Sequence, residues 1–325
     1  MAGHDGGWVM NNIKLQNLRF FIAVYEEGSI SAAARKVHAT QSGVSVQIRD
    51  LEDQLGLSLF ERVSTGVAPT KAGEQIYRRA LQILREVGRL EEDVSAHTGQ
   101  LAGEVRVGIM PTFARAILAP ALVSFSTAHP NVDVKVTEGY SGLLTQMVLA
   151  GDLDFAVVPD GDIPTGLRGR FLDSDLELLA SKKPIAGLQG AVDLAELPAL
   201  RLVLPGPSNA RRAKIDQRLT TYGTARHNII ELDSMMTTLD MIRRGDWCSI
   251  LPGCLCLPDL TASDLHFYPI RRPNMTVDYL LIEPATKAAS PATRLFAEGL
   301  SAEIRQGCAQ CRLHFGVVEG SHAQT

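Results

Sequence analysis

Hydrophobic residues recur at helical spacing along the first hundred residues of the chain. Between residues 14 and 27 the apolar positions fall three or four residues apart, and Gly28 follows as a residue that ends helices. A second helix is predicted to begin at Ser31, a good N-cap residue. Its inner face consists of small residues that let another helix approach closely: Ala33, Ala34 and Val37.

A third helix is predicted to begin near Thr40 or Gln41 and to end at Gly56. Its apolar positions form one buried stripe: Val44, Ile48, Leu51 and Leu55. The opposite face presents Ser42, Ser45, Val46, Gln47 and Arg49. Two helices joined by a short turn, the second with an exposed polar N-terminal half, are typical of a helix-turn-helix that reaches into DNA. The spacing also fits a helical hairpin whose polar face is merely solvated.

The next segment favours the DNA-binding interpretation. The run "LGLSLFERVSTGVAPTKAGEQI" has two short apolar stretches around a Gly turn, which predicts a β-hairpin wing. One long helix should follow from Thr70 to about residue 98. A seven-residue repeat along it predicts a coiled-coil dimer seam, with packing on its own domain as the alternative; the seam positions are Ile76, Ala80, Ile83, Val87, Leu90 and Val94.

Beyond Gly103 short β-rich runs alternate with amphipathic stretches. The expected strands are "VRVGIM", "VDVKVTE", "DFAVVP", "LELLAS", "LRLVLP", "HNIIEL" and "WCSILP". Such alternation predicts parallel sheets with helices on their faces, and ligands in this fold class bind at the carboxyl ends of strands. Thr112, Ser208 and Asn209 lie at two such ends, each before a predicted helix. Two helix N-termini facing one cleft would favour an anion, whereas each alone fits ordinary capping.

Residues 14–79 resemble the winged helix-turn-helix of the LysR-type transcriptional regulators. The matching residues occur in order: Leu18, Phe20, Phe21, Gly28, Ser29, Ala32, Ala33, Ala34, Gln41, Ser42, Ser45, Ile48, Leu51, Glu52, Leu55, Gly56, Leu59, Phe60, Arg62, Thr70, Ala72 and Gly73. Val46 departs from the family pattern, because Arg, Gln or Lys is frequent there. The resemblance implies DNA contacts from Ser31, Thr40, Gln41, Ser42, Ser45, Val46, Gln47, Arg49, Arg62 and Thr70.

Residues 104–306 resemble the effector domain of the same family, which consists of two α/β lobes similar to periplasmic solute-binding proteins. The landmarks are "LAPALVSFSTAHPNVDVKV", "LLTQMVLAGDLDFAVVP" and "MIRRGDWCSILP". The resemblance implies an inducer between the lobes and a change of lobe arrangement that alters how a tetramer holds DNA. The implied effector-binding residues are Thr112, Phe113, Ser141, Pro159, Ser208, Asn209, Asp233 and Ser234.

The expected organisation has five parts. They are a disordered extension (residues 1–12), the winged helix-turn-helix (13–70), a linker and dimerisation helix (71–98), the effector domain (99–306) and a C-terminal tail (307–325). The expected partners are pseudo-palindromic promoter DNA, a small inducer that is a carboxylate, and further copies of the chain in a dimer or a dimer of dimers. RNA polymerase is left open as a partner, and the family resemblance favours an activator.

Composition changes this picture only slightly. The net charge of −4 gives no overall basic footprint, so affinity for DNA should depend on dimeric binding. No apolar run is long enough for a membrane span or a secretory signal, which predicts a cytoplasmic protein. No nucleophile elbow, phosphate loop or zinc-binding His/Glu spacing appears, so neither catalysis nor a cofactor is expected.

The five cysteines leave one alternative open. They are expected to be reduced thiols, because an odd number without a signal peptide does not indicate a disulfide framework. Cys248, Cys254 and Cys256 could instead form a redox switch that replaces the small-molecule effector. The pair Cys308 and Cys311 is expected to lie in the tail, after the last helix, with no metal bound.

Overall fold

A computed structural model describes residues 13–317, except residues 65, 98–100, 186, 189, 208, 225, 263 and 287. Of residues 91–97, 226 and 227 only the backbone is described. The chain divides into two compact units, Met1–Val94 and Ser95–Thr325. Residues 1–12, expected as an extension, and Ser208 lie outside the described residues.

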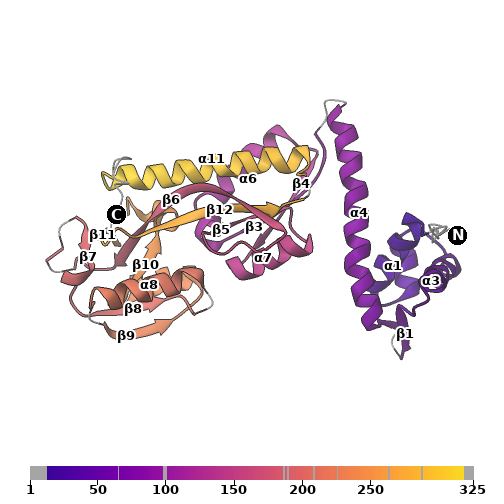
Figure 1. The fold of residues 1–325 in the computed structure, drawn as a ribbon, viewed down its shortest axis with the longest axis horizontal. Helices are drawn as coiled ribbons and strands as arrows, with labels where there is room; N and C mark the ends of the chain where they lie inside the picture. Colours follow the sequence, from indigo (N-terminus) through magenta and orange to yellow (C-terminus); the bar gives the residue numbers. More distant parts are fainter. Residues whose placement is uncertain are drawn as a thin grey trace, which may run out of the picture. The chain divides into compact units, whose positions relative to one another are not determined.

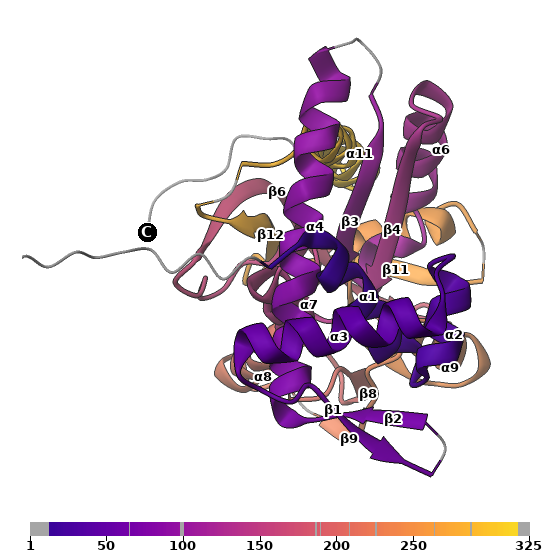
Figure 2. The same cartoon turned by 90° about the vertical axis from the view of Figure 1, so that its right-hand side faces the viewer.

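The first unit is a three-helix core with a hairpin and a long helix (Figure 2). Its elements are α1 (Leu15–Glu27), α2 (Ile30–Lys36), α3 (Gln41–Leu55), β1 (Phe60–Val63), β2 (Gly66–Pro69) and α4 (Lys71–His97). The apolar faces of the helices meet in one core around Phe21, Val44 and Leu51, all fully buried. The hairpin pairs β1 antiparallel to β2, and the ring of Phe60 contacts that of Phe21 at 5.3 Å between centroids. The hairpin is therefore held by the same core.

Local sequence explains the helix ends. Gly28 and Gly56 end α1 and α3 in the left-handed conformation (φ 59° and 65°), which glycine adopts without steric cost. Thr40 caps α3, since its hydroxyl accepts the Gly43 N–H at 3.1 Å. The prediction that Ser31 caps α2 is wrong. Ser29 has the extended backbone of an N-cap and accepts the Ala32 N–H, so the helix begins two residues earlier than predicted.

Part of the predicted dimer seam on α4 belongs to the core of its own unit. Ala80 is 1% exposed in this core, and Ile76 packs against it, so these two positions do not face a partner helix. The next seam positions differ: Ile83 is 46% and Leu90 65% exposed, and Val87 is half-buried. The side chain of Val94 lies outside the described residues. The seam that remains available is therefore the C-terminal part of α4.

The second unit consists of two lobes that share one strand (Figure 1). In the first lobe the sheet order is β4-β3-β5-β12-β6, and in the second it is β7-β11-β6-β10-β8-β9. The strands are β3 (Gly103–Ile109), β4 (Val132–Glu138), β5 (Phe155–Pro159), β6 (Leu167–Ser181), β7 (Val192–Asp193), β8 (Leu200–Leu204), β9 (Arg226–Glu231), β10 (Cys248–Pro252), β11 (His266–Arg272) and β12 (Thr276–Pro284).

The sheets are mixed, so the expectation of parallel sheets is only partly right. The pairs β3·β4, β3·β5, β8·β9 and β8·β10 are parallel, but β12 and the 15-residue strand β6 run antiparallel to their neighbours. Strand β6 changes partners at the lobe junction: Leu176 pairs with Thr276 of β12, and Glu177 with Pro252 of β10. The run "LELLAS" is thus only the second half of a strand that passes through both lobes.

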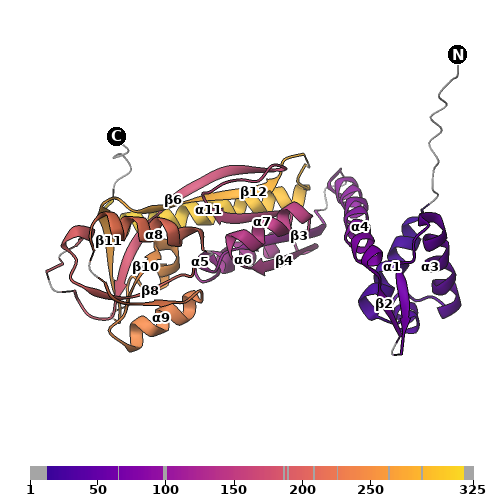
Figure 3. The same cartoon turned by 60° about the horizontal axis from the view of Figure 1, so that its bottom comes forward.

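Helices cover both faces of these sheets. They are α5 (Pro111–Ala114), α6 (Leu118–Ala128), α7 (Ser141–Ala150), α8 (Ala210–Thr221), α9 (Met235–Arg244), α10 (Gly253–Cys256), α11 (Pro291–His314) and the 3-10 turns η1 (Leu194–Glu196) and η2 (Leu257–Asp259). In the second lobe α8 and α9 lie on opposite faces (Figure 3). Alternate residues of β6 explain this, since Leu179 packs with α8 and Leu178 with α9. Among the described residues no helix is both long and apolar enough to span a bilayer.

The predicted C-terminal tail is partly wrong. Helix α11 continues to His314, and Cys308 and Cys311 are fully buried on it. They extend the buried stripe of Leu300 and Ile304 at helical spacing, so the pair belongs to the core and not to a tail.

Candidate functional site

The outward face of α3 carries the side chains expected to meet DNA. Ser42, Val46 and Arg49 are exposed, and Ser45 and Gln47 are half-buried. Val44, Ile48 and Leu51 are buried on the opposite face, as the apolar stripe predicted. In the described part of the chain Arg49, and Arg62 on the hairpin, are exposed and make no ion pair. Their guanidinium groups are therefore available to phosphates or guanine edges.

Two polar contacts fix the position of α3. Asn17 of α1 is 2% exposed and donates to the Gln47 carbonyl oxygen at 3.3 Å. Glu52, on the last turn of α3, accepts the N–H groups of Leu59 and Phe60 at 2.6 and 3.2 Å. The helix is thereby attached to α1 on one side and to the start of the hairpin on the other. Its exposed face is preorganised before any DNA arrives.

Three hydroxyls assigned to DNA contacts have structural partners. Thr40 caps α3, and the Ser31 hydroxyl lies 3.1 Å from that of Ser29. Thr70 donates to the Ser58 carbonyl oxygen at 2.8 Å and accepts the Gly73 N–H at 3.0 Å, which caps α4. Thr40 and Thr70 thus stabilise helix ends, as Ser and Thr do at such positions, whereas Ser31 contacts the capping residue Ser29. The exposed Gln41 at the start of α3 keeps its side chain toward solvent.

Four of the predicted effector residues line one small cavity at the lobe junction. Thr112, Ser141 and Pro159 come from the first lobe and Asn209 from the second. The remaining wall residues are Met110, Pro111, Tyr140, Arg211 and Met235. Its volume is about 10 Å³, which is room for a single water molecule. In this arrangement the lobes are closed on each other at this point.

The other predicted effector residues lie elsewhere. Phe113 is fully buried in the first-lobe core against Tyr279, with 4.6 Å between ring centroids, so its assignment to the cavity wall is wrong. Ser234 is exposed and caps α9 by accepting the Thr237 N–H. Asp233 is exposed and accepts the Gly206 N–H at 2.8 Å. Burial and the Asp233 carboxylate both raise the pKa of Tyr140, which lines the small cavity.

The two helix N-termini expected to bind an anion belong to helices of different length. Helix α5, which begins beside Thr112, has only four residues, so its peptide dipoles sum to little. Helix α8 has twelve residues, but Asn209 Oδ1 already accepts the Arg211 N–H at its start. Positive charge in the junction therefore comes mainly from side chains.

A buried ion pair lies next to the small cavity. Arg211, 5% exposed, donates from Nε to Glu177 Oε1 at 2.8 Å and from Nη2 to Oε2 at 2.5 Å. Nη2 also donates to the Ile250 carbonyl oxygen at 3.0 Å. The third nitrogen, Nη1, is buried and has no hydrogen-bond partner. An unpaired guanidinium nitrogen in this setting is costly, so it favours a ligand that accepts from it.

Arg211 also lines a larger cavity of about 300 Å³ between the lobes. Asp160 and Thr276 stand on the first-lobe side, and α8 supplies two exposed cations, Lys214 and Arg218. Pro159 borders this cavity, the small one and a third of about 230 Å³ that Ser141 also lines. The sequence reasoning missed Arg211, Lys214 and Arg218. Their spacing of three and four residues on one helix, directly after Asn209, was the available signal.

Strand β6 presents three acidic residues on one face through the lobe junction, each bound to a different helix. Asp173 accepts two hydrogen bonds from Arg312 of α11, at 3.0 and 3.1 Å. Asp175 accepts the Cys254 N–H of α10 at 2.8 Å. Glu177 binds Arg211 of α8, as described above. Residues two apart share a face of a strand, which is why one strand holds three helices.

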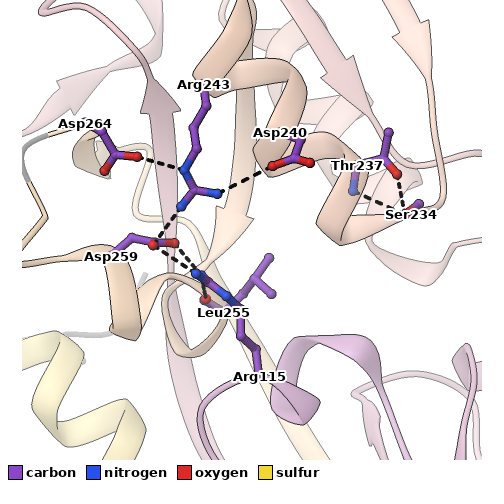
Figure 4. A network of polar contacts seen from close by, with 8 residues as sticks. All are labelled: Arg115, Ser234, Thr237, Asp240, Arg243, Leu255, Asp259 and Asp264. Carbon is purple, nitrogen blue, oxygen red and sulfur yellow. Dashed lines mark hydrogen bonds and ion pairs between the residues drawn. The ribbon is translucent and has the colours of Figure 1, made fainter.

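An ionic network holds α9 beside the junction (Figure 4). Asp259, 5% exposed, accepts from Arg243 at the end of α9 at 2.7 Å and from Arg115, which follows α5, at 2.9 Å. Arg243 also donates to Asp264 at 2.8 Å. The network therefore links the first-lobe segment after α5 to the second-lobe helix that Ser234 caps.

The cysteines proposed as a redox switch do not form one group. Cys248, Cys254 and Cys256 are buried in three different hydrophobic cores. All five cysteines are free thiols. Burial raises the pKa of Cys248 to about 11 and that of Cys256 well above its ordinary value, so both stay protonated. Thiols of this kind react slowly with oxidants, which argues against the predicted switch.

A winged helix-turn-helix joined by a long helix to two α/β lobes with a cavity between them defines a DNA-binding regulator with a ligand-binding domain. The family model for the LysR substrate binding domain matches residues 98–305, and that for the bacterial regulatory helix-turn-helix protein, lysR family, matches residues 15–74. The chain belongs to the LysR family of transcriptional regulators.

Relatives cover nearly the whole chain. The nitrogen assimilation regulatory protein nac of Klebsiella aerogenes is 28% identical over 288 residues, 88% of this chain and 93% of that protein. The regulator TdcA of Escherichia coli is 27% identical over 251 residues, 75% of this chain and 79% of its own.

Two solved structures share the fold. A full-length OxyR variant from Pseudomonas aeruginosa has a TM-score of 0.67 at 22% identity and covers 90% of this chain and 94% of that one. CbnR in complex with its target DNA has a TM-score of 0.63 at 24% identity and covers 89% and 99%.

Proposed function

We propose that the chain is a transcriptional activator that α3 directs to promoter DNA and that a small organic anion, a carboxylate, controls by binding between the lobes. The observation that carries the anion proposal is that Arg211 lines both junction cavities and keeps one guanidinium nitrogen, Nη1, without a hydrogen-bond partner. A carboxylate accepts from such a nitrogen in a charge-assisted hydrogen bond, worth about 1.5–3 kcal/mol. Lys214 and Arg218 add positive potential in the larger cavity.

The closed small cavity suggests how binding acts on the lobes. At about 10 Å³ it excludes any organic ligand, whereas the cavity of about 300 Å³ is the size of small-molecule sites. A ligand in the larger cavity contacts Thr276 of the first lobe and Lys214 of the second. It therefore favours the lobe arrangement that it binds more tightly. At saturation the equilibrium between two arrangements shifts by the ratio of the ligand's affinities for them.

On the DNA side, Gln47 and Arg49 are the proposed base-reading residues. Arg49 is exposed without an ion pair, and the Gln47 backbone is fixed by Asn17. Exposed Ile83 and Leu90 on α4 support a dimer, in which two α3 helices meet two half-sites. Val46, 49% exposed, has no polar atom to offer and suits the methyl group of a thymine.

A thermal-shift screen tests the effector proposal. The purified full-length protein is heated with a panel of small carboxylates, aromatic acids and neutral metabolites of similar size. A ligand that binds the folded state raises the melting temperature. At a ligand concentration of a hundred times its Kd, the free energy of unfolding increases by about 2.7 kcal/mol. We expect the shift to be confined to anions and to weaken with salt, because part of the attraction is exposed charge.

Matched variants locate the ligand. Lys214→Ala and Arg218→Ala remove exposed cations of the cavity, so the fold should tolerate them, and each should weaken binding by up to about fivefold. Lys182→Ala removes an exposed cation outside the cavity walls and should leave binding unchanged. A full shift in the Lys214→Ala, Arg218→Ala double variant, or an equal response to neutral compounds, would contradict the anion site.

Activation is tested by transcription in vitro. An operator is first selected from random DNA by binding, then placed upstream of a weak promoter with purified RNA polymerase. The proposal expects more transcript with protein and effector together than with polymerase alone. Less transcript under the same conditions would identify a repressor and leave the DNA-binding assignment intact.

A further inference from the structure

Three cysteines and one carboxylate gather in the interior where β6, α10 and α11 meet. The Sγ atoms of Cys254 and Cys308 are 3.5 Å apart, and a carboxylate oxygen of Asp175 lies within 4.8 Å of both. Cys311 borders the same space: a β-carbon added to Gly253 would collide with both Cys311 Sγ and Asp175 Oδ1. None of these side chains lines the junction cavities described above.

The carboxylate at the centre of this group is not fully satisfied. Asp175 is 0% exposed, and Oδ2 accepts from the Cys254 N–H at 2.8 Å and from the Tyr279 hydroxyl at 3.3 Å. Its other oxygen, Oδ1, is buried and has no hydrogen-bond partner. Leaving such an oxygen without a partner costs about 1–3 kcal/mol or more. Hydrophobic packing of the thiols accounts for the cysteines but not for this oxygen.

The geometry suits a thiophilic cation. Zinc binds thiolate sulfur at about 2.3 Å in a tetrahedron, which places two sulfur ligands about 3.8 Å apart. The 3.5 Å between Cys254 and Cys308 is close to that value and well beyond the S–S bond length of about 2.05 Å in a disulfide. A carboxylate oxygen of Asp175 lies close enough to be a third ligand, and Cys311 borders the space beside Gly253.

We propose that Cys254, Cys308 and Asp175 form a binding site for a divalent thiophilic cation of the zinc or cadmium class. On binding, each thiol that becomes a ligand loses its proton to solvent and its sulfur lone pair forms the bond to the metal, with no change of oxidation state. Asp175 Oδ1 supplies the oxygen ligand. The ion would link β6, the strand shared by the lobes, to α10 and to the end of α11.

Cadmium binding to the full-length protein tests the proposal. The protein is purified under reducing conditions, treated with a chelator and titrated with Cd²⁺, whose thiolate complexes absorb in the near ultraviolet. We expect a saturable band at one equivalent of metal, confirmed by elemental analysis, and a band of tetrahedral Co²⁺ on substitution. Absence of the band at one equivalent in the folded wild-type protein would overturn the site.

Three variants identify the ligands. Cys254→Ser and Cys308→Ser should each lower the affinity at least tenfold, and Asp175→Asn should lower it without removing a thiol. Cys248→Ser is the matched control, because Cys248 is a buried thiol in a separate core. Circular dichroism checks that each variant is folded. Equal loss in Cys248→Ser, or full binding in Cys308→Ser, would place the metal elsewhere and refute the assignment.

Alkylation of the wild-type protein tests the metal site without any substitution. With Cd²⁺ bound, mass spectrometry should show Cys254 and Cys308 protected at least tenfold more than Cys248 during slow unfolding in denaturant. Equal labelling of the three thiols with metal present refutes the site. Formation of a Cys254–Cys308 disulfide with peroxide, in a protein that takes up no metal, would also overturn it and assign the pair to redox chemistry.

Discussion

Replacing Glu177 with Gln should strongly destabilise the effector domain. The substitution keeps the shape of the side chain but leaves the Arg211 guanidinium, 5% exposed, without its counter-ion. Breaking a buried pair from one side costs about 3–5 kcal/mol, because the remaining charge stays desolvated. For a domain of this size the melting temperature should fall by about 6–20 °C.

The assay is urea unfolding followed by tryptophan fluorescence. The chain has two tryptophans, so a Trp8→Phe background leaves Trp247 as the reporter of the effector domain. Trp247 is half-buried, and the Arg201 guanidinium lies 4.2 Å from the centre of its ring, so its emission should change on unfolding. The midpoint and slope of the transition together give the free energy of unfolding.

Glu283→Gln is the control for this prediction. Glu283 accepts from Arg168 at 2.9 Å, but the arginine is 55% exposed, and exposed pairs contribute about 0–1 kcal/mol. A second check is the double variant Glu177→Leu, Arg211→Met, which removes both charges and should recover much of the lost stability. If Glu177→Gln unfolded within about 1 kcal/mol of the parent, the buried pair would not have the role that its geometry indicates.

Three further outcomes are expected from the DNA-binding unit. Arg49→Ala should lower operator affinity about tenfold in a fluorescence anisotropy titration without changing stability, and unchanged affinity would remove Arg49 from the interface. Leu90→Asp, at a side chain that is 65% exposed, should convert the dimer to monomer by light scattering, whereas a persisting dimer would exclude this part of α4. Gly73→Ala should destabilise the unit by about 1–3 kcal/mol in thermal unfolding, because the new β-carbon meets the Leu59 carbonyl oxygen. Gly88→Ala on the same helix meets open space and should stabilise the unit by up to about 1 kcal/mol, so equal effects of the two substitutions would refute the close approach at Gly73.

The DNA-binding unit was predictable because its information is local. The stripe from Val44 to Leu55 defines the inner face of α3, and Gly28 and Gly56 mark the ends of helices by their backbone conformation alone. The cap of α2 was assigned to Ser31 and not Ser29, because two serines two residues apart give the same signal and only the turn geometry distinguishes them. The division of α4 between its own core and a partner also required the three-dimensional structure, since Ala80 and Ile83 share one repeat.

The effector site was less predictable because its key contacts join distant segments. Thr112 and Asn209 were predicted from strand ends that precede helices, Ser141 and Pro159 came from family resemblance, and all four line one cavity. Arg211 was missed, because an arginine at the start of an amphipathic helix usually faces water, and its partner is 34 residues away on β6. Strands β11 and β12 were missed as well, and their antiparallel pairing with β6 joins segments far apart in the sequence, so it has no local signature.

The burial of Cys308 and Cys311 could have been predicted from sequence, but their contacts could not. The apolar stripe of α11 continues from Leu300 through both cysteines, so extending the helical pattern past residue 306 would have placed them in the core. Their proximity to Cys254, 54 residues earlier in the chain, is a property of the packed lobes and has no signature in spacing.

The acidic face of β6 couples twisting of this strand to the helices of both lobes. Asp173, Asp175 and Glu177 are clamped in succession by α11, α10 and α8, so the strand is gripped on both sides of the point where it changes lobes. A rotation of one lobe against the other cannot be absorbed by sliding of β6. It has to appear as twist within a few residues, and the helix at each clamp turns with it. A ligand that displaces Arg211 from Glu177 would therefore also shift Arg312, near the C-terminal end of α11.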